Sequence, residues 1–218
     1  MRSLFIILAL YAVSLPIIPS ATKADLVGVL PTTPGGDDYQ AYYDTVANLT
    51  WLANGNTNSQ MDWITANGWA AGLSINGVTG WRLPNTFQPD ASCDSQGNEG
   101  GYGYNCIGSE LGQLFYTVLG GAAGDSINTT HNGNYDLFSN VLGNWYWSAT
   151  DLPVPDNDYA WFFDFNDGSQ FATNKPASIF AWAVHTGNAA EVPLPATLPL
   201  LGAGLLGFIS AASRKKPL

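Results

Sequence analysis

Five aspartates crowd the stretch from residue 151 to residue 167, and they are the side chains of this sequence best suited to holding a cation. They are Asp151, Asp156, Asp158, Asp164 and Asp167. Oxygen-rich loops are what Ca²⁺ requires, so the pattern suggests a calcium site with Asp156, Asp158, Asp164 and Asp167 as ligands. No Asp-x-Asp-x-Asp-Gly loop ending in glutamate accompanies them. The alternative is that the acidity keeps the domain soluble, and then no cofactor is needed.

Motifs of catalysis are missing from the sequence. It contains no Gly-x-Ser-x-Gly elbow, no P-loop and no His-Glu-x-x-His metal motif. Carboxylates are plentiful, so acid and base chemistry on glycosidic bonds stays open. The segment Gln88-Pro89-Asp90 matches a tripeptide that calcium-dependent lectins use for galactose, but the Trp-Asn-Asp that completes their ion site is absent, and we interpret the match as chance. We expect a protein that is not an enzyme.

The two cysteines, Cys93 and Cys106, flank a loop of twelve polar and small residues. In an oxidising compartment such a pair forms one disulfide, which stabilises the fold by about 3 kcal/mol through loop-closure entropy. His131 and His185 are the only histidines, and neither has a zinc-like spacing to the cysteines. We therefore predict a disulfide that clamps a flexible loop.

Charge is unevenly distributed along the chain. The net charge is -10, yet five of the seven basic residues lie near the two ends. Residues 25–191 contain 17 acidic residues and only Arg82 and Lys175 as bases, a net of 2 − 17 = −15. Binding to a phosphate backbone needs clustered lysine and arginine. Nucleic acid is therefore excluded as a partner.

The N-terminus has the order of a signal peptide. Met1-Arg2-Ser3 is a short positive region, an apolar run follows from Leu4 to Ile18, and small residues precede Asp25. This order predicts cleavage after residue 24. An uncleaved membrane anchor is the alternative, although an apolar run of about 15 residues is short for a spanning helix.

The C-terminus has three parts, which together indicate a membrane segment. The rigid linker Val192-Pro193-Leu194-Pro195-Ala196 precedes an apolar run over residues 197–212, and the chain then carries Arg214, Lys215 and Lys216. The apolar run predicts a transmembrane helix, and the positive residues after it predict a stop-transfer signal that remains in the cytoplasm. A simple tail anchor is one interpretation of this order.

This tail resembles the PEP-CTERM sorting signal of Gram-negative bacteria in its Val-Pro-Leu-Pro-Ala variant. The resemblance implies that residues 192–196 are the motif recognised by an exosortase, a membrane protease and transpeptidase, and that residues 214–216 are the retention charges. Leu194 stands where the commonest form has glutamate. The resemblance also implies transient residence in the inner membrane, a final place on the cell surface or in the extracellular matrix, and an association with exopolysaccharide.

The elements between the two ends predict an α+β domain. Alternating apolar residues predict a strand over residues 42–52, and strand-like runs follow at residues 145–150, 159–165 and 179–186. Asn166-Asp167-Gly168 predicts a tight turn that joins the second of these runs to residues 170–172. We expect one small antiparallel sheet covered by two helices.

Two helices follow from capping and spacing. Ser59 and Asp62 have the spacing of a capping box, which predicts a helix from residue 60 to residue 73. After Ser109, an apolar stripe with helical spacing predicts a second helix that ends at Gly120-Gly121. The stripe, which we expect to be buried, consists of Leu111, Leu114, Phe115, Val118 and Leu119.

A series of aromatic motifs resembles the Lcl C-terminal domain family over residues 48–186. Its clearest members are Trp81-Arg82-Leu83-Pro84 and Tyr146-Trp147-Ser148-Ala149-Thr150, with further matches at residues 49–52, 160–168 and 181–184. The resemblance implies a fold related to the C-type-lectin-like fold. Some members of the family are surface adhesins that bind glycosaminoglycans.

The motif residues are interpreted as architecture. Arg82 is the lone arginine of an acidic domain, which predicts a buried bidentate pair with a carboxylate. The tryptophans of the motifs are expected to fill the core, with stacking on a sugar as the alternative. They are Trp51, Trp81, Trp147, Trp161 and Trp182.

Three segments result: a signal peptide (1–24), a single C-type-lectin-like domain (25–191) and a sorting tail (192–218). We expect an exported, non-enzymatic surface or matrix protein that contacts carbohydrate or matrix proteins. The alternative is a structural matrix component without a specific ligand.

Overall fold

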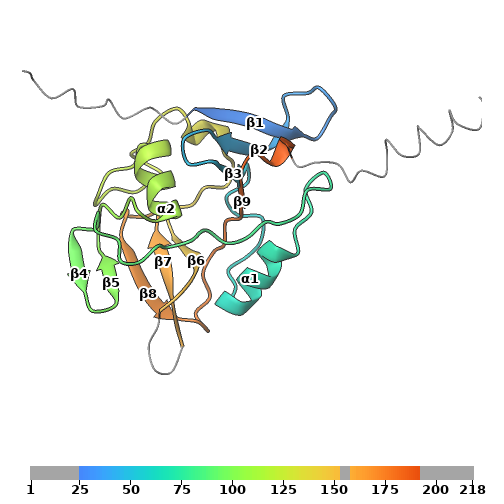
Figure 1. The fold of residues 1–218 in the computed structure, drawn as a ribbon. Coiled ribbons are helices and arrows are strands. Elements are labelled where there is room, and N and C mark those ends of the chain that lie inside the picture. Colours follow the sequence, from blue (N-terminus) through green and yellow to red (C-terminus); the bar gives the residue numbers. More distant parts are fainter. Residues whose placement is uncertain (1–24, 153–157, 192–218) are drawn as a thin grey trace, which may run out of the picture.

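The computed structural model describes residues 25–152 and 158–191, which form one body built from small antiparallel sheets (Figure 1). The first sheet has the strand order β1-β2-β3-β9. Its strands are β1 (Leu26–Pro31), β2 (Tyr39–Asp44), β3 (Leu49–Leu52) and β9 (Val184–Thr186). Both ends of the described chain lie at this sheet, because the final turn η3 (Ala189–Glu191) contacts β1.

The second sheet consists of β6 (Trp145–Asp151), β7 (Tyr159–Asp164) and β8 (Gln170–Asn174). Beside the outer edge of β8 lies a separate hairpin, β4 (Ser95–Gly97) and β5 (Gly100–Tyr102) (Figure 1). Gly103 and Gln170 exchange backbone hydrogen bonds of 2.9 and 2.7 Å, which attach this hairpin to β8. The fold is α+β as expected, but it has three small sheets where we predicted one.

Helix α1 (Trp63–Ala71) begins later than the sequence predicts, because a different residue caps it. Asp62 adopts an extended backbone, and its Oδ1 accepts a hydrogen bond of 2.8 Å from the backbone N–H of Thr65. The capping box with Ser59 is therefore wrong. The ionised carboxylate is the stronger acceptor, and it also accepts from the Thr65 hydroxyl at 3.0 Å.

The second helix is confirmed. Helix α2 (Glu110–Gln113) continues into a π-helical turn, η1 (Leu114–Val118), and the Ser109 hydroxyl accepts a hydrogen bond from the backbone N–H of Gly112. All five residues of the predicted apolar stripe are at most 1% exposed. A 3-10 turn, η2 (Tyr135–Leu137), follows in the long connection to β6.

Two predicted strands are shorter than expected. Residues 45–48 form a turn between β2 and β3, since Asp44 Oδ1 accepts from the backbone N–H groups of Val46 and Ala47 and Asn48 has a φ of 54°. The segment from Ile179 onward forms only isolated bridges until β9 begins at Val184. The hairpin of β7 and β8 around residues 166–168 is confirmed.

Aromatic side chains fill the core between the first and second sheets. Trp182 contacts the rings of Trp51, Tyr146 and Phe165 at centroid distances of 5.9, 6.0 and 5.9 Å. All five motif tryptophans are at most 3% exposed. The predicted core role is confirmed for Trp51, Trp81, Trp147 and Trp182, whereas Trp161 is buried outside the main core cluster.

Within residues 25–152 and 158–191, no helix has the length and apolar character needed to cross a bilayer. The predicted signal peptide (1–24) and the predicted helix over residues 197–212 lie outside the described residues, as do the sorting motif and the terminal charges.

Candidate functional site: an aromatic groove beside the disulfide-closed hairpin

The Trp-Arg-Leu-Pro segment joins the two larger sheets. Arg82 exchanges two backbone hydrogen bonds of 2.9 Å with Val184 of β9. Two residues later, the carbonyl of Pro84 accepts from the backbone N–H of Ala149 of β6 at 2.7 Å. Leu83, which lies between these contacts, and Trp81, which precedes them, are buried. The segment therefore acts as a strap from one sheet to the other.

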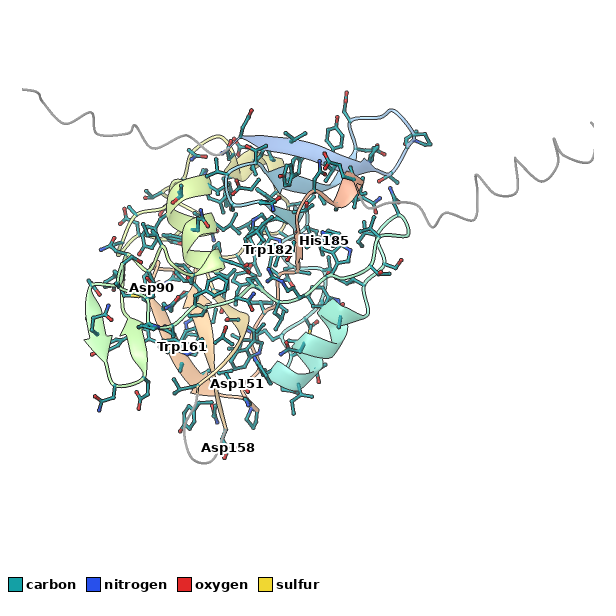
Figure 2. The ribbon with its side chains drawn as sticks, in the orientation of Figure 1. Asp90, Asp151, Asp158, Trp161, Trp182 and His185 are labelled. Carbon is teal, nitrogen blue, oxygen red and sulfur yellow. A yellow bond between two sulfur atoms is a disulfide. The ribbon has the colours of Figure 1, made fainter. Side chains whose placement is uncertain are left out.

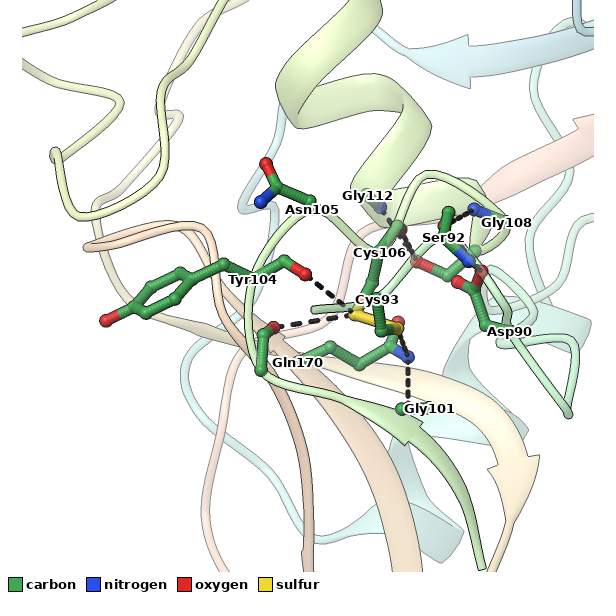
Figure 3. Close-up of a disulfide and its surroundings, with 12 residues drawn as sticks. Asp90, Ser92, Cys93, Gly101, Tyr104, Asn105, Cys106, Gly108, Gly112 and Gln170 are labelled. Carbon is green, nitrogen blue, oxygen red and sulfur yellow. Dashed lines mark hydrogen bonds between the residues drawn. A yellow bond between two sulfur atoms is a disulfide. The ribbon is translucent and has the colours of Figure 1, made fainter. Parts of the chain in front are cut away.

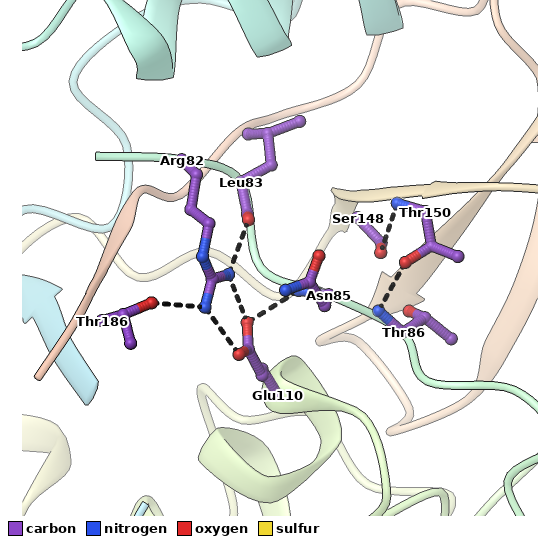
Figure 4. Close-up of polar contacts among 8 residues, drawn as sticks. All are labelled: Arg82, Leu83, Asn85, Thr86, Glu110, Ser148, Thr150 and Thr186. Carbon is purple, nitrogen blue, oxygen red and sulfur yellow. Dashed lines mark hydrogen bonds and ion pairs between the residues drawn. The ribbon is translucent and has the colours of Figure 1, made fainter. Parts of the chain in front are cut away.

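Arg82 forms the predicted bidentate pair, and its partner is Glu110 (Figure 4); the carboxylate is buried, but the arginine side chain is 29% exposed. Its two terminal nitrogens lie 2.7 and 2.8 Å from the carboxylate oxygens of Glu110. The same carboxylate accepts a hydrogen bond of 2.7 Å from the backbone N–H of Asn85. Because Glu110 is the first residue of α2, the pair ties that helix to the strap. Both charges are used within the fold.

The second motif, around Tyr146, Trp147 and Ser148, is also structural. Trp147 donates its indole N–H to the carbonyl of Met61 at 2.9 Å, and the hydroxyl of Ser148 accepts from the backbone N–H of Thr150 at 3.1 Å. Burial raises the pKa of the Tyr146 hydroxyl well above its ordinary value. None of the three side chains is exposed.

The structure contains the predicted disulfide between Cys93 and Cys106, and the loop that it closes is ordered into the hairpin of β4 and β5 (Figure 3). The hairpin packs on residues 88–90. Gln88 Oε1 accepts from the backbone N–H of Gly101 at 2.8 Å, and a Cβ added to Gly101 would lie 2.1 Å from the carbonyl oxygen of Asp90. The sequence-based expectation of a flexible loop did not include this hairpin. The Gln88 side chain, held in these contacts, is not presented to a ligand.

The predicted calcium ligands are not brought together. Asp158 and Asp164 stand at opposite ends of β7, about 20 Å apart at the rise of an extended strand. Asp164 accepts from the backbone N–H of Asn166 at 2.7 Å, and Asp167 accepts from that of Ser169 at 2.9 Å, so both carboxylates serve the turn. Asp156 lies outside the described residues. A single calcium site that includes both Asp158 and Asp164 is therefore incompatible with the extended strand β7.

Among the described residues, one group of three side chains has its potential metal-binding atoms close together. It consists of Asp90, Cys93 and Cys106. Both sulfurs of this group are joined in the disulfide. A disulfide sulfur is not the thiolate that metal ions bind, so this group is not a metal site in the oxidised protein.

An aromatic groove lies where the hairpin meets the second sheet. It encloses about 320 Å³, and three elements line it, β5, β7 and β8. Residues at the ends of β4–β5 and β6 complete its walls. Its main side chains are Glu99, Tyr102, Leu152, Tyr159, Trp161 and Phe171. Figure 2 shows Trp161 in the half of the molecule that holds the hairpin and the second sheet. We call these six side chains the groove residues.

Three rings of the groove are unusually open to solvent for aromatic side chains. Tyr102, Tyr159 and Phe171 are 39%, 45% and 41% exposed, and the rings of Tyr102 and Phe171 lie 5.9 Å apart. Trp161, only 3% exposed, supplies a fourth ring, and among the described residues its indole N–H has no hydrogen-bond partner. Apolar rings with a few polar groups are typical of small-ligand sites.

Contacts from outside the groove hold its walls together. The backbone bonds between Gly103 and Gln170 place Tyr102 next to Phe171. From η1, the Tyr116 hydroxyl donates to the carbonyl of Gly168 at 2.6 Å and accepts from the backbone N–H of Asn105 at 3.0 Å. This single side chain therefore ties the disulfide loop to the turn before β8.

Most groove residues could not be found from the sequence. Trp161 was identified there as a motif residue, whereas Glu99, Tyr102 and Phe171 carried no signal, because their proximity depends on pairing between β5 and β8. Two other hollows are less aromatic. One, beside α1, is lined by Asp62, Ile64, Thr65, Lys175 and Pro176, and the other by residues 56–60 with Phe180. The groove is therefore the candidate site.

Comparison with known proteins gives two family matches. The Lcl C-terminal domain family matches residues 40–185, and the PEP-CTERM protein-sorting motif matches residues 191–216. No curated protein and no solved structure matches the chain. Proteins with the sorting motif are exported, are recognised by the membrane protein exosortase, and reach the cell surface in Gram-negative bacteria. Because the first match spans more than half of the 218 residues, the chain belongs to the Lcl C-terminal domain family and carries a PEP-CTERM sorting signal at its end.

Proposed function

We propose that this chain is a non-enzymatic surface or matrix protein that contacts carbohydrate through the aromatic groove. The observation that carries the proposal is the set of exposed rings of Tyr102, Tyr159 and Phe171 around one hollow. The sorting signal supports a location at the cell surface, where an exported protein encounters polysaccharide.

The physical argument concerns what such rings bind. A sugar ring has an apolar face of C–H groups and an edge of hydroxyls. Aromatic faces pack against the first, while polar groups at the rim bind the second. In the groove, Glu99 and the hydroxyls of Tyr102 and Tyr159 supply polar atoms beside the rings. Isolated exposed apolar residues need no explanation, but a gathered set indicates an interaction site.

The contents of the groove also support binding without catalysis. Hydrolysis of a glycosidic bond ordinarily needs two carboxylates about 5–10 Å apart. Glu99 is the one carboxylate among the residues lining the groove in the described chain. A relation to the C-type-lectin-like fold, and an association with exopolysaccharide, are parts of the same proposal, supported by the family and the sorting signal.

A binding experiment with matched variants tests the proposal. The full chain, purified in a polyoxyethylene detergent that carries no sugar, is applied to a glycan array and to the exopolysaccharide of its host. Tyr102→Ala combined with Phe171→Ala is expected to weaken binding at least tenfold, because both rings stack on the ligand. The control is Ile64→Ala, which removes an apolar side chain that is 73% exposed on α1, away from the groove.

The outcomes separate carbohydrate binding from a purely structural role. Native protein that stays unbound on every glycan at high concentration would remove the proposal. Self-assembly of that same protein, measured by light scattering, would then favour the matrix component without a ligand. Equal loss of binding in the groove variant and in Ile64→Ala would show that the groove is not the binding site.

A further inference from the structure

Among the described residues that line the groove, the charged side chain is that of Glu99. Glu99 lines the groove with an exposed carboxylate, and exposed Asp158 immediately precedes the groove residue Tyr159. The ion pairs found among the described residues are Arg82 with Glu110 and Lys175 with Asp151. Neither Glu99 nor Asp158 belongs to them.

Both cations of residues 25–191 are engaged outside the groove. Arg82 is held by Glu110, as described above. Lys175 Nζ lies 3.0 Å from Asp151 Oδ1 and 4.5 Å from the centre of the Trp63 ring, on the side of the second sheet that faces α1. Among the described residues, no lysine or arginine lines the groove, so a bound acidic sugar would meet the carboxylate of Glu99 without a neighbouring cation.

We propose that the groove selects glycans whose sugars carry free amino groups, and that it disfavours uronic acids and sulfated sugars. This inference rests on the proposed function and adds to it the chemical class of the ligand. At neutral pH a sugar amine is a cation, which Glu99 attracts directly and which the faces of Tyr102 and Phe171 attract through their ring quadrupoles. A carboxylate or sulfate on the sugar meets repulsion from the same residues.

Size and long-range charge point to a polymer as the occupant. A volume of about 320 Å³ lies near the lower end of the range for small-ligand sites, roughly 300–1,000 Å³, and suits a short stretch of sugar chain. The net charge of −15 over residues 25–191 attracts a polycation from beyond the groove. The ligand class is therefore a hexosamine polymer that has lost part of its N-acetyl groups.

The test compares oligosaccharides that differ only in charge. The full chain in polyoxyethylene detergent is titrated with oligomers of glucosamine, of N-acetylglucosamine and of a uronic acid, all of equal length, at a mildly acidic pH that keeps amines protonated. We expect the amine form to bind at least tenfold more tightly than the acetylated form at low salt. This preference should shrink as salt is added, because salt screens the exposed carboxylates.

Matched variants assign the preference to the groove. Glu99→Gln should reduce the preference for the amine form at least threefold, whereas Asp136→Asn, which removes an exposed charge on η2, should leave it unchanged. Both variants alter the net charge equally, so general attraction cancels in the comparison. Equal losses in the two variants would overturn the assignment to the groove.

The failure of this inference can be told apart from the failure of the proposed function. Equal binding of amine and acetylated oligomers, or tighter binding of the uronic acid, would overturn the amino-sugar class and leave carbohydrate binding intact. Absence of binding to every oligomer and every arrayed glycan would remove both.

Discussion

At the scale of single residues, Arg82 connects more of the fold than any other charged side chain described above. Its backbone bonds to β9, and its guanidinium holds the carboxylate that begins α2. Glu110 is buried, and a buried carboxylate that loses its cation also loses the compensation for its desolvation. The pair therefore stabilises the fold.

We predict that Arg82→Lys lowers the free energy of unfolding by about 1–3 kcal/mol, because lysine keeps the charge but cannot make the two parallel hydrogen bonds. Chemical denaturation measures the change. As a control, Asp151→Asn breaks the other ion pair, in which the aspartate side chain is 43% exposed, and should cost less than about 1 kcal/mol. A smaller loss in Arg82→Lys than in this control would contradict the argument.

Asp164 gives a prediction about pH. Burial raises the pKa of its carboxyl group above the ordinary value, although hydrogen bonds from Asn166 and Trp145 oppose the shift. A raised native pKa means that the folded protein binds the proton more tightly than the unfolded chain, so ionisation destabilises the fold. The contribution of this group is greatest below the unfolded pKa, about 3.9, and is lost as pH rises through the native pKa.

The corresponding variant is Asp164→Asn, which cannot ionise. Relative to the native protein, its free energy of unfolding should increase as pH rises from about 3 to 7, on top of any constant offset from the altered hydrogen bonds. Denaturation curves across this range measure the difference. A difference that is flat with pH, or that falls, would show that burial does not control this carboxyl group.

At the scale of elements, the sequence predicted correctly those helices and turns that depend on contacts within one short segment. The helix after Ser109 was predicted correctly, because its cap, its apolar stripe and the glycines that end it are all within one short segment. Residues 42–52 also looked like one strand, but Asp44 and Asn48 form a turn inside it. Strand β1 and the hairpin of β4 and β5 went unpredicted, since neither alternates clearly and each depends on a partner strand.

The same distinction explains why the groove escaped prediction. Trp161 and Phe171 are both aromatic residues within strands, yet one is 3% and the other 41% exposed. Their difference arises from the register of β7 and β8, in which Trp161 pairs with Ala172, and from the hairpin beside β8. The spacing of residues within one strand indicates neither its register with the next strand nor the presence of a hairpin beside it.

The disulfide gives a prediction for the hairpin that carries Glu99 and Tyr102. Replacing both Cys93 and Cys106 with alanine should lower the free energy of unfolding by about 3 kcal/mol, because the crosslink restricts the unfolded chain. It should also weaken glycan binding while leaving the near-ultraviolet circular dichroism of the aromatic core largely unchanged. The reason is that the hairpin, which forms one wall of the groove, loses its covalent link. Binding and near-ultraviolet circular dichroism are compared on the same sample; undiminished binding would show that the groove does not need the hairpin.

At the scale of the whole molecule, the sorting signal predicts a processed product. Intact mass of the protein recovered from the cell surface should lack residues 1–24 and most of the chain after Ala196, because the signal peptide and the exosortase substrate are both cut. A variant with the segment Val192–Ala196 replaced by glycine and serine serves as the control and should keep its tail. Recovery of the native protein with its full C-terminus would contradict processing.

The position of the chain ends has a further consequence for how the molecule stands on a surface. The final turn η3, which ends at Glu191, contacts β1, whereas β5, β7 and β8, whose residues line the groove, lie toward the opposite end of the body (Figure 1). A protein held through its C-terminal end would thus have a fixed polarity, with its attachment point facing the cell and the aromatic groove facing outward. One such molecule could then link a single cell surface to a ligand held in the groove.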